Sequence, residues 1–193
     1  MSINIDKQKL RDALPLWTIG TRSGDMVLSY FADGYYTSRA SSAAPGNSYG
    51  SLWTIGALFD FGTYQCKAYI SAPGANRGMH VFGFEYHHGW AGEGLIWFQN
   101  TAGVYGVGTR TQVDGTYPYT ITTLGGEDWT TEKTFKIEWT SGSVKFYVDG
   151  VLKATHTTYI HQTPMCLYIE TFTLATPPGV EFGIWSLKEF QEL

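Results

Sequence analysis

The sequence predicts an all-β protein, a jelly-roll β-sandwich of two stacked antiparallel sheets with a short helix at its N-terminus. Apolar and polar residues alternate through residues 135–155, which is the pattern of strands that bury one face. Aromatic residues make up 16% of the chain, which has 23 glycines and only 16% charged residues. That composition is typical of short strands joined by many turns. A chain of 193 residues most economically makes one domain of this class.

The alternating stretch predicts a three-stranded antiparallel meander. Thr140 to Ser143 and the pair Asp149-Gly150 divide it, and Asp-Gly suits a tight hairpin turn because glycine tolerates positive φ. The apolar face of the meander needs a second sheet to cover it. The residues that we expect on that face are Phe135, Ile137, Trp139, Val144, Phe146 and Val148.

The N-terminal residues predict a short helix over residues 6–14. Asp6 can cap this helix, and Pro15 ends it. We therefore divide the chain into a helical appendage, residues 1–15, and a jelly-roll domain, residues 16–193.

About a dozen short strands are expected, separated by turns rich in glycine and proline. The first two form a hairpin around Gly34, and a loop is expected from Ala40 to Gly50. Gly103, Gly106 and Gly108 open no helix, so we do not expect a phosphate-binding loop. Outside the meander, the main expected strands are Met26–Phe31, Tyr35–Arg39, Trp53–Phe61, Gly62–Ser71, Met79–Phe84, Leu95–Gln99, Val104–Val113, Tyr117–Thr123, Met165–Phe172 and Gly183–Phe190.

The charge balance argues against two classes of partner. The formal net charge is −4 and no block of lysine and arginine occurs, so we expect neither nucleic acid nor a membrane as a partner. A neutral polar ligand fits better. No stretch is long enough to cross a bilayer, and the N-terminus lacks the apolar core that a secretion signal needs. The sequence leaves open whether an export signal has been removed, the protein is intracellular, or it belongs to a phage or virus particle.

Three segments carry a resemblance to a known family. They are residues 56–70, residues 80–98, and residues 135–152, which read F-K-I-E-W-T-S-G-S-V-K-F-Y-V-D-G-V-L. These segments resemble the concanavalin A-like lectin/glucanase superfamily, and specifically glycoside hydrolase family 16. The resemblance runs in order over about residues 17–190 and implies a concanavalin A-like sandwich.

The same resemblance implies where catalytic residues would stand. Enzymes of family 16 carry the motif Glu-x-Asp-x-(x)-Glu on a central strand of the concave sheet, with the first Glu as nucleophile and the last as acid/base. Here Glu93 matches the first position, Leu95 stands at the Asp position, and Trp97 or Phe98 stands at the last. We therefore expect a degenerate catalytic motif and a domain that is not an efficient enzyme.

Aromatic and hydrogen-bonding side chains gather around this segment. Sugars present apolar faces that stack on aromatic rings and hydroxyl groups that bind polar side chains. We predict a carbohydrate-binding domain that recognises a β-linked polysaccharide on its concave face. The other interpretation of Trp97 and Phe172 is that they are core residues of an aromatic-rich sandwich. The residues expected to bind the ligand are Tyr86, His87, Trp90, Glu93, Trp97, Gln99, Glu170 and Phe172.

Two other functions stay open. A divergent glycoside hydrolase acting on β-glucan or galactan would use Glu93 with Glu170 or Glu85. A retaining mechanism needs two carboxyl groups about 5 Å apart, and an inverting one a pair up to about 9.5 Å apart. A structural or receptor-binding module of a virus particle or surface assembly would use the sandwich mainly for protein contacts. The sequence leaves the oligomeric state open.

We expect no cofactor and no metal site built from side chains. Five histidines occur, but they show no three-ligand spacing such as H-E-x-x-H. The resemblance leaves open a structural calcium held partly by backbone carbonyls. Cys66 and Cys166 lie on separate expected strands and either pair between the sheets or remain two buried thiols. Because no export signal is visible, we favour the thiols.

Overall fold

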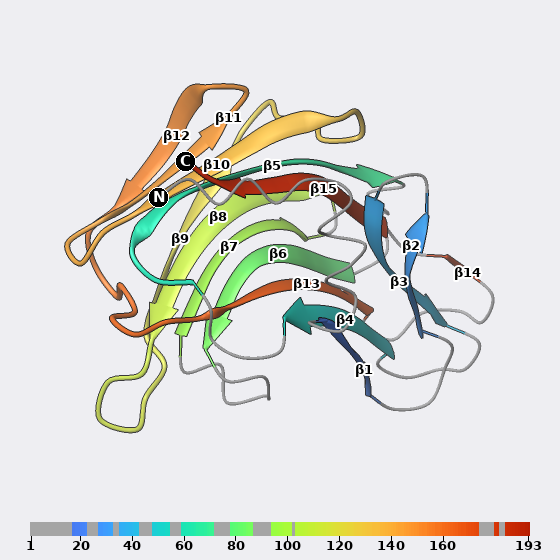
Figure 1. Ribbon diagram of the computed structural model, residues 1–193, viewed down its shortest axis with the longest axis horizontal. Coiled ribbons are helices and arrows are strands. Elements are labelled where there is room, and N and C mark those ends of the chain that lie inside the picture. Colours follow the sequence, from blue (N-terminus) through green and yellow to red (C-terminus); the bar gives the residue numbers. More distant parts are fainter. Residues whose placement is uncertain are drawn as a thin grey trace.

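The computed structural model describes residues 17–22, 27–32, 35–42, 48–54, 59–71, 78–86, 94–101, 103–173, 180–181 and 184–193. Over these residues the chain forms fifteen strands and no helix, and the strands make two antiparallel sheets that stack face to face (Figure 1). The predicted all-β jelly-roll sandwich is therefore confirmed. The helix predicted over residues 6–14 lies outside the described residues. In the part of the chain that the structure describes, no helix is able to span a membrane.

The first sheet, called sheet A below, has seven strands in the order β1-β4-β13-β6-β7-β8-β9. It curves so that the face turned away from the second sheet is concave (Figure 1). Its strands are β1 (Trp17–Arg22), β4 (Ser48–Thr54), β13 (Cys166–Thr173), β6 (Gly78–Tyr86), β7 (Gly94–Thr101), β8 (Val104–Thr111) and β9 (Tyr119–Leu124).

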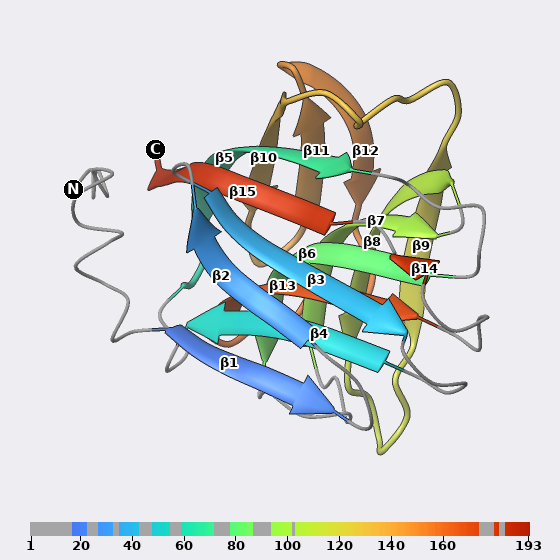
Figure 2. The same cartoon turned by 90° about the vertical axis from the view of Figure 1, so that its right-hand side faces the viewer.

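The second sheet, called sheet B, has the strand order β12-β11-β10-β5-β15-β3-β14, and β2 also pairs with β3. Figure 2 shows β2 and β3 lying beside β4 of sheet A at one end of the sandwich. The strands of sheet B are β12 (Val151–His156), β11 (Val144–Val148), β10 (Lys133–Trp139), β5 (Gly62–Ser71), β15 (Ile184–Glu192), β3 (Tyr35–Ser42), β14 (Val180–Glu181) and β2 (Val27–Ala32).

The predicted meander forms β10, β11 and β12 at one edge of sheet B. Asp149 and Gly150 have φ angles of 50° and 77°, which is the tight turn that an Asp-Gly pair favours. Oδ1 of Asp149 accepts a hydrogen bond from the backbone N–H of Thr134 at 2.9 Å, and this bond ties the turn to β10. All six residues predicted to face the core are buried: Phe135, Ile137, Trp139, Val144, Phe146 and Val148.

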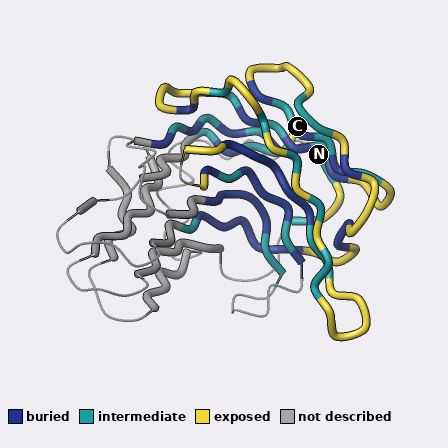
Figure 3. Tube along the Cα trace, turned by 180° about the vertical axis from the view of Figure 1, so that it is seen from behind, coloured by how far each residue is buried: buried dark blue, intermediate teal, exposed yellow. Residues whose placement is uncertain are grey.

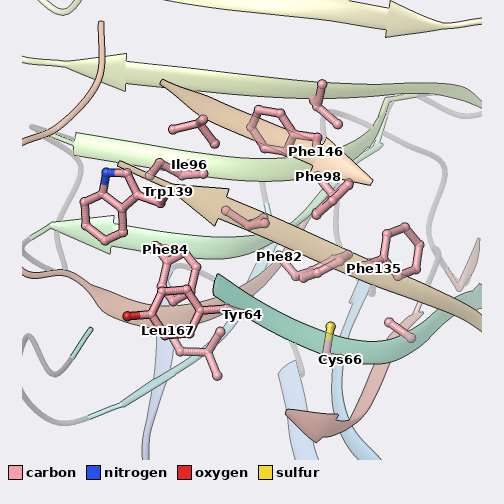
Figure 4. Packing of buried hydrophobic residues seen from close by; sticks show 14 of the residues in the cluster. Tyr64, Cys66, Phe82, Phe84, Ile96, Phe98, Phe135, Trp139, Phe146 and Leu167 are labelled. Carbon is pink, nitrogen blue, oxygen red and sulfur yellow. The ribbon is translucent and has the colours of Figure 1, made fainter. Parts of the chain in front are cut away.

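Aromatic rings from both sheets fill the core (Figure 4). Phe82 and Phe98 of sheet A meet Phe135 of sheet B with ring centroids 5.0 and 4.9 Å apart, both in edge-to-face geometry. Such pairs add about 0.5–1.5 kcal/mol to the gain from burial. Figure 3 shows that the middle strands are buried while the hairpin loops are exposed. Burial of this aromatic layer is the main source of stability in the sandwich.

Two of the predicted boundaries are wrong. The loop expected over residues 40–50 is shorter, because β3 and β4 extend into it from both sides. The strand expected over residues 53–61 ends at Thr54, and Phe59 forms an isolated bridge with Met165 instead. Pairing with neighbouring strands decides these ends more than local composition does. The other expected strands are confirmed, with small shifts of their ends.

Trp129 lies in the connection from β9 to β10, where the chain passes from sheet A to sheet B. Its side chain is fully buried, and its Nε1 donates a hydrogen bond to Oε2 of Glu127 at 2.9 Å. Glu127 in turn pairs with Lys153 at 2.7 Å. The carbonyl of Trp129 accepts a hydrogen bond from the backbone N–H of Ile70 at 2.8 Å. This connection is therefore anchored inside the sandwich.

Cys66 and Cys166 are both buried and form no disulfide bond, which confirms the favoured interpretation. Cys66 points from β5 into the core (Figure 4), and burial raises the pKa of its thiol. Cys166 precedes Leu167, which packs in the core, so alternation turns Cys166 to the other side of sheet A. The two thiols lie on opposite sides of that sheet and do not face one another.

A buried polar seam closes the sandwich where β12 meets β8 and β9. His156 is buried, and its Nδ1 and Nε2 lie 3.1 and 2.9 Å from the hydroxyl oxygens of Thr109 and Thr122. The Thr109 hydroxyl donates to the carbonyl of Thr158 at 3.2 Å. That bond assigns the proton to Nδ1 of His156 and leaves Nε2 to accept from Thr122. With a neutral imidazole, both ring nitrogens of His156 therefore have hydrogen-bond partners.

Acid should weaken this seam. Burial lowers the pKa of His156, because a charged imidazole is poorly solvated there. The unfolded chain binds the proton at about pH 6.5, so the contribution of His156 is fully present above that pH and is lost as pH falls below it. We expect the unfolding free energy of the wild type to fall from pH 7 to 5 more steeply than that of His156→Gln. Urea titrations across this range measure both, and parallel curves would contradict the assignment.

Candidate functional site

Strand β7 carries the outward-facing residues at the middle of the concave face of sheet A. Side chains alternate along a strand. Ile96 and Phe98 point inward and belong to the main core cluster, so Leu95, Trp97 and Gln99 point outward. Three consecutive outward positions therefore present an apolar side chain, an indole and an amide.

Strand pairing aligns two aromatic residues with two glycines across this face. Gly83 on β6 lies opposite both Tyr168 on β13 and Trp97 on β7, and Trp97 lies opposite Gly108 on β8. Aromatic residues and glycines therefore alternate in one cross-strand row over the four strands β13, β6, β7 and β8. A glycine beside each ring leaves space for the ring to lie along the sheet.

Both glycines are required by their surroundings. A Cβ added at Gly108 would overlap the indole of Trp97, so the indole lies against the backbone of β8. Gly83 has a φ of 152°, a conformation that favours glycine, and a Cβ there would overlap the carbonyl of Ile96. The glycines at positions 83 and 108 thus leave the space in which the indole of Trp97 lies.

The indole of Trp97 is also held at its polar edge. Its Nε1 donates a hydrogen bond to Oε1 of Gln99 at 2.6 Å. Val81, Trp97 and Tyr168 form a buried cluster with Leu95 packed against it, separate from the main core, and we call these four residues the floor cluster. Trp97 keeps 7% of its surface exposed. The ring is fixed before any ligand arrives, which reduces the entropy lost on binding.

Two carboxylates flank Tyr168 along the strands. Glu170 follows it by two residues on β13, and Glu85 lies two residues beyond Gly83 on β6. Burial raises the pKa of Tyr168 well above its usual value, the charges of Glu170 and Glu85 raise it further, and the charge of Arg110 opposes them. Tyr168 therefore keeps its proton at neutral pH and remains a hydrogen-bond donor.

The register separates Glu85 from Glu170. Glu170 lies opposite Val81, four residues before Glu85, which places their Cα atoms about 14 Å apart at the usual strand and residue spacings. Strand side chains stand roughly perpendicular to the sheet. The two residues are therefore a poor match for the carboxyl pair of a retaining or inverting glycosidase. They are better placed as separate hydrogen-bond acceptors.

Arg110 and β9 extend this face toward the edge of the sheet. Arg110 lies opposite Leu95 on β7 and opposite Tyr119 on β9. Its Cζ lies 4.8 Å from the centroid of the Tyr117 ring. Tyr119 and Ile121, on the same face of β9, are 62% and 43% exposed. The face therefore combines a buried aromatic floor, acceptors on one side, and a cation with exposed apolar groups on the other.

The structure brings several of the predicted site residues together. Trp97, Gln99 and Glu170 share the outer face of sheet A with Glu85. Phe172 belongs to β13, where the register pairs it with Met79 of β6. Three predicted residues lie outside the described part of the chain: His87, Trp90 and Glu93.

Tyr86 lies apart from this group. It follows Glu85 on β6, so it points to the opposite side of the sheet, and it packs against the main core cluster. Its ring centroid lies 4.6 Å from that of His161. His161 is buried, with its ring nitrogens 3.3 Å from the hydroxyl of Thr111 and 2.7 Å from that of Thr163. Tyr86 and His161 therefore form part of the inner packing.

Tyr168, Arg110 and Gly108 belong to this face, although the sequence did not indicate a place for any of them in the candidate site. Two residues of sequence separate the end of β7 from the start of β8, and counting back from them places Gly108 opposite Trp97 and Arg110 opposite Leu95. This count was the signal that could have found two of the three. Tyr168 comes from a strand far along the chain, and its pairing with β6 leaves no local signal.

Two positions on this face carry apolar side chains in place of the carboxylates of the family 16 motif. Leu95 and Trp97 stand where the resemblance to family 16 places the second and third catalytic carboxylates, and both point outward on β7. The arrangement offers a mostly buried aromatic floor, acceptors for hydroxyl groups and a guanidinium donor. Among the described residues, no group of three His, Cys, Asp or Glu side chains could hold a metal ion.

Several solved structures are similar to this chain over nearly its whole length. A β-glucanase of Bacillus licheniformis has 20% identity and a TM-score of 0.62, with 93% of this chain and 92% of that chain covered. A family 16 endo-glucanase of Bacteroides ovatus has 12% identity, a TM-score of 0.70 and coverage of 93% and 95%. The laminarinase catalytic domain of Thermotoga petrophila has 13% identity, a TM-score of 0.65 and coverage of 93% and 90%.

No protein-family model matches the sequence, and the comparison with curated proteins finds no match. The similarity is therefore one of fold. The chain has the concanavalin A-like jelly-roll fold of the family 16 glucanases, as the sequence motifs predicted.

Proposed function

We propose that this domain binds a β-linked polysaccharide on the concave face of sheet A and does not cleave it efficiently. The observation that carries the proposal is the indole of Trp97, fixed against Gly108 and Gln99 at a position where the family 16 resemblance calls for a catalytic acid. An aromatic side chain there serves binding and cannot transfer a proton to a leaving group.

The chemistry of the face suits a sugar. The apolar C–H face of a pyranose ring packs on the exposed part of the floor cluster. Glu85 and Glu170 are acceptors for sugar hydroxyl groups, and the protonated phenol of Tyr168 is a donor. The family 16 endo-glucanase of similar fold was solved in complex with G4G3G-2F-DNP. A mixed-linkage β-glucan is therefore the first ligand to test.

Titration calorimetry with oligosaccharides of mixed-linkage β-glucan, laminarin and galactan tests the proposal. We expect weak, enthalpy-driven binding by the wild type and about tenfold weaker binding by Trp97→Ala, since one aromatic contact contributes about 0.5–1.5 kcal/mol beyond its area. Tyr147→Ala is the matched control, because Tyr147 is an aromatic residue on the outer face of sheet B, bonded to Glu138. Equal affinities in all three proteins would exclude Trp97 from the site.

A divergent hydrolase is the second candidate. Glu85 and Glu170 both lie on the concave face, which favours a site where Glu93 works with one of them. Reducing ends released from β-glucan or galactan by the wild type, and lost in Glu93→Gln, would establish this activity. A structural or receptor-binding module is the third candidate, and a stable higher oligomer together with a blank glycan array would support it.

A further inference from the structure

Arg110 is the one basic residue that strands β7, β8 and β9 contribute, and it stands on the concave face. Its cross-strand neighbours on that face are Leu95 and Tyr119, neither of which is acidic. No ion pair between described residues involves Arg110. The guanidinium is thus placed in the candidate site without a carboxylate from this part of the chain to neutralise it.

The guanidinium is oriented but not saturated. Its Cζ lies over the ring of Tyr117, 4.8 Å from the centroid, and this cation–π contact restrains the position of the group. Its Nε is buried and has no hydrogen-bond partner among the described residues. A buried donor without a partner is costly, and an unpaired group of this kind needs an explanation such as a bound ligand. The arrangement is that of a donor held ready for an acceptor.

The chemistry of arginine limits the kinds of ligand group that Arg110 would bind. Its five N–H groups form a planar fork that can give two parallel, charge-assisted hydrogen bonds to a carboxylate or sulfate, whereas a neutral hydroxyl oxygen accepts a weaker bond. Glu85 lies in the same cross-strand row, on the other side of Leu95, and the carboxylate of Glu170 also belongs to this face. These negative charges and the net charge of −4 disfavour a ligand that is anionic at every sugar.

We propose that Arg110 binds a single acidic substituent, a carboxylate or a sulfate ester, on a β-linked glycan whose neighbouring sugar units are neutral. This inference rests on the proposed glycan-binding function and names the class of glycan. The exposed ring of Tyr119 supports the acidic sugar from the adjacent strand. The same face then binds two kinds of ligand group: hydroxyl groups near Glu85 and Glu170, and one anionic group near the β9 edge.

Calorimetry with three tetrasaccharides tests the inference. The probes are a neutral mixed-linkage β-glucan tetrasaccharide, a hyaluronan tetrasaccharide with carboxylates on alternate sugars, and a keratan sulfate tetrasaccharide with sulfate esters on alternate sugars; all three are β-linked. We expect the wild type to prefer one anionic probe over the neutral one, and the preferred probe tells carboxylate from sulfate. In Arg110→Gln the ratio of the anionic to the neutral affinity should fall about 10- to 100-fold.

Lys145→Gln is the matched control, because it removes the same charge from β11 in sheet B. A second measurement needs no variant: raising NaCl from 0.05 to 0.5 M should erase the anionic preference and leave neutral binding unchanged. Neutral binding without an anionic preference, or equal losses for both probes in Arg110→Gln, would overturn this inference and keep the proposed function. Failure of the wild type to bind any of the three probes would overturn both.

Discussion

Replacing Trp129 with alanine should lower the free energy of unfolding by about 3–5 kcal/mol, the usual cost of removing a large aromatic side chain from a core. Trp129 is fully buried, and its ring centroid lies 4.6 Å from that of Tyr105 and 5.1 Å from that of Phe135. These two contacts join sheet A to sheet B. The substitution also removes the hydrogen bond of 2.9 Å that Nε1 of Trp129 donates to Oε2 of Glu127.

Urea denaturation at pH 7 measures this effect, and two variants calibrate it. Trp129→Phe retains most of the ring and loses the N–H group, so we expect a loss of about 1–3 kcal/mol. Leu152→Ala removes a half-exposed side chain on the edge strand β12 and should change stability by less than about 1 kcal/mol. If Trp129→Ala were no more destabilising than Leu152→Ala, the connection between the sheets would not be the anchor described here.

Replacing Gly108 with alanine should lower glycan affinity about tenfold without removing any group that touches the ligand. The added methyl group would overlap the indole of Trp97, so the ring must leave its seat. Trp97 then loses its place beside Gln99 and its contact with the floor cluster. The loss of one oriented aromatic contact accounts for this change in affinity.

The same substitution should destabilise the fold only by about 1–3 kcal/mol, the usual cost of an added methyl group in a packed region. Thermal unfolding measures this cost alongside calorimetry with the β-glucan oligosaccharide. Gly142→Ala is the control, because a Cβ there meets no atom within 4 Å. Wild-type affinity in a folded Gly108→Ala protein would show that the seated indole is not part of the binding surface.

The sequence predicts the meander well because the signals there are local. Alternation places Phe135, Phe146 and Val148 on one face, and the Asp149-Gly150 pair fixes the turn and so the register of β11 with β12. The structure buries all three side chains. Each of these facts can be read within a few residues of sequence.

The site is only partly predictable because it depends on pairings between distant strands. Trp97 and Glu170 were expected to share a face, and they do. The contact of Tyr168 with Trp97 depends on β13 pairing with β6, which no local pattern records. The seating of the Trp97 indole on Gly108 depends on the register of β7 with β8. The placement of Tyr86 against His161 likewise follows from packing.

The buried polar groups were the least predictable. His156 and His161 are two of the five histidines that show no metal-ligand spacing, and nothing else in the sequence indicates that both are buried and hydrogen-bonded to threonine hydroxyl groups. Trp129 lies in a connection between strands, where the sequence gives no periodicity to indicate burial. In each case the partners come from other strands, so burial follows from the assembled sandwich.

One titration tests glycan binding without cleavage most directly. Wild-type protein is mixed with mixed-linkage β-glucan oligosaccharides, and heat of binding and reducing ends are measured in the same sample over several hours. We predict a saturable heat that Gly108→Ala abolishes or weakens, together with a constant number of reducing ends. A steady rise in reducing ends that Glu93→Gln stops, or no saturable heat with any β-linked glycan, would contradict the proposal.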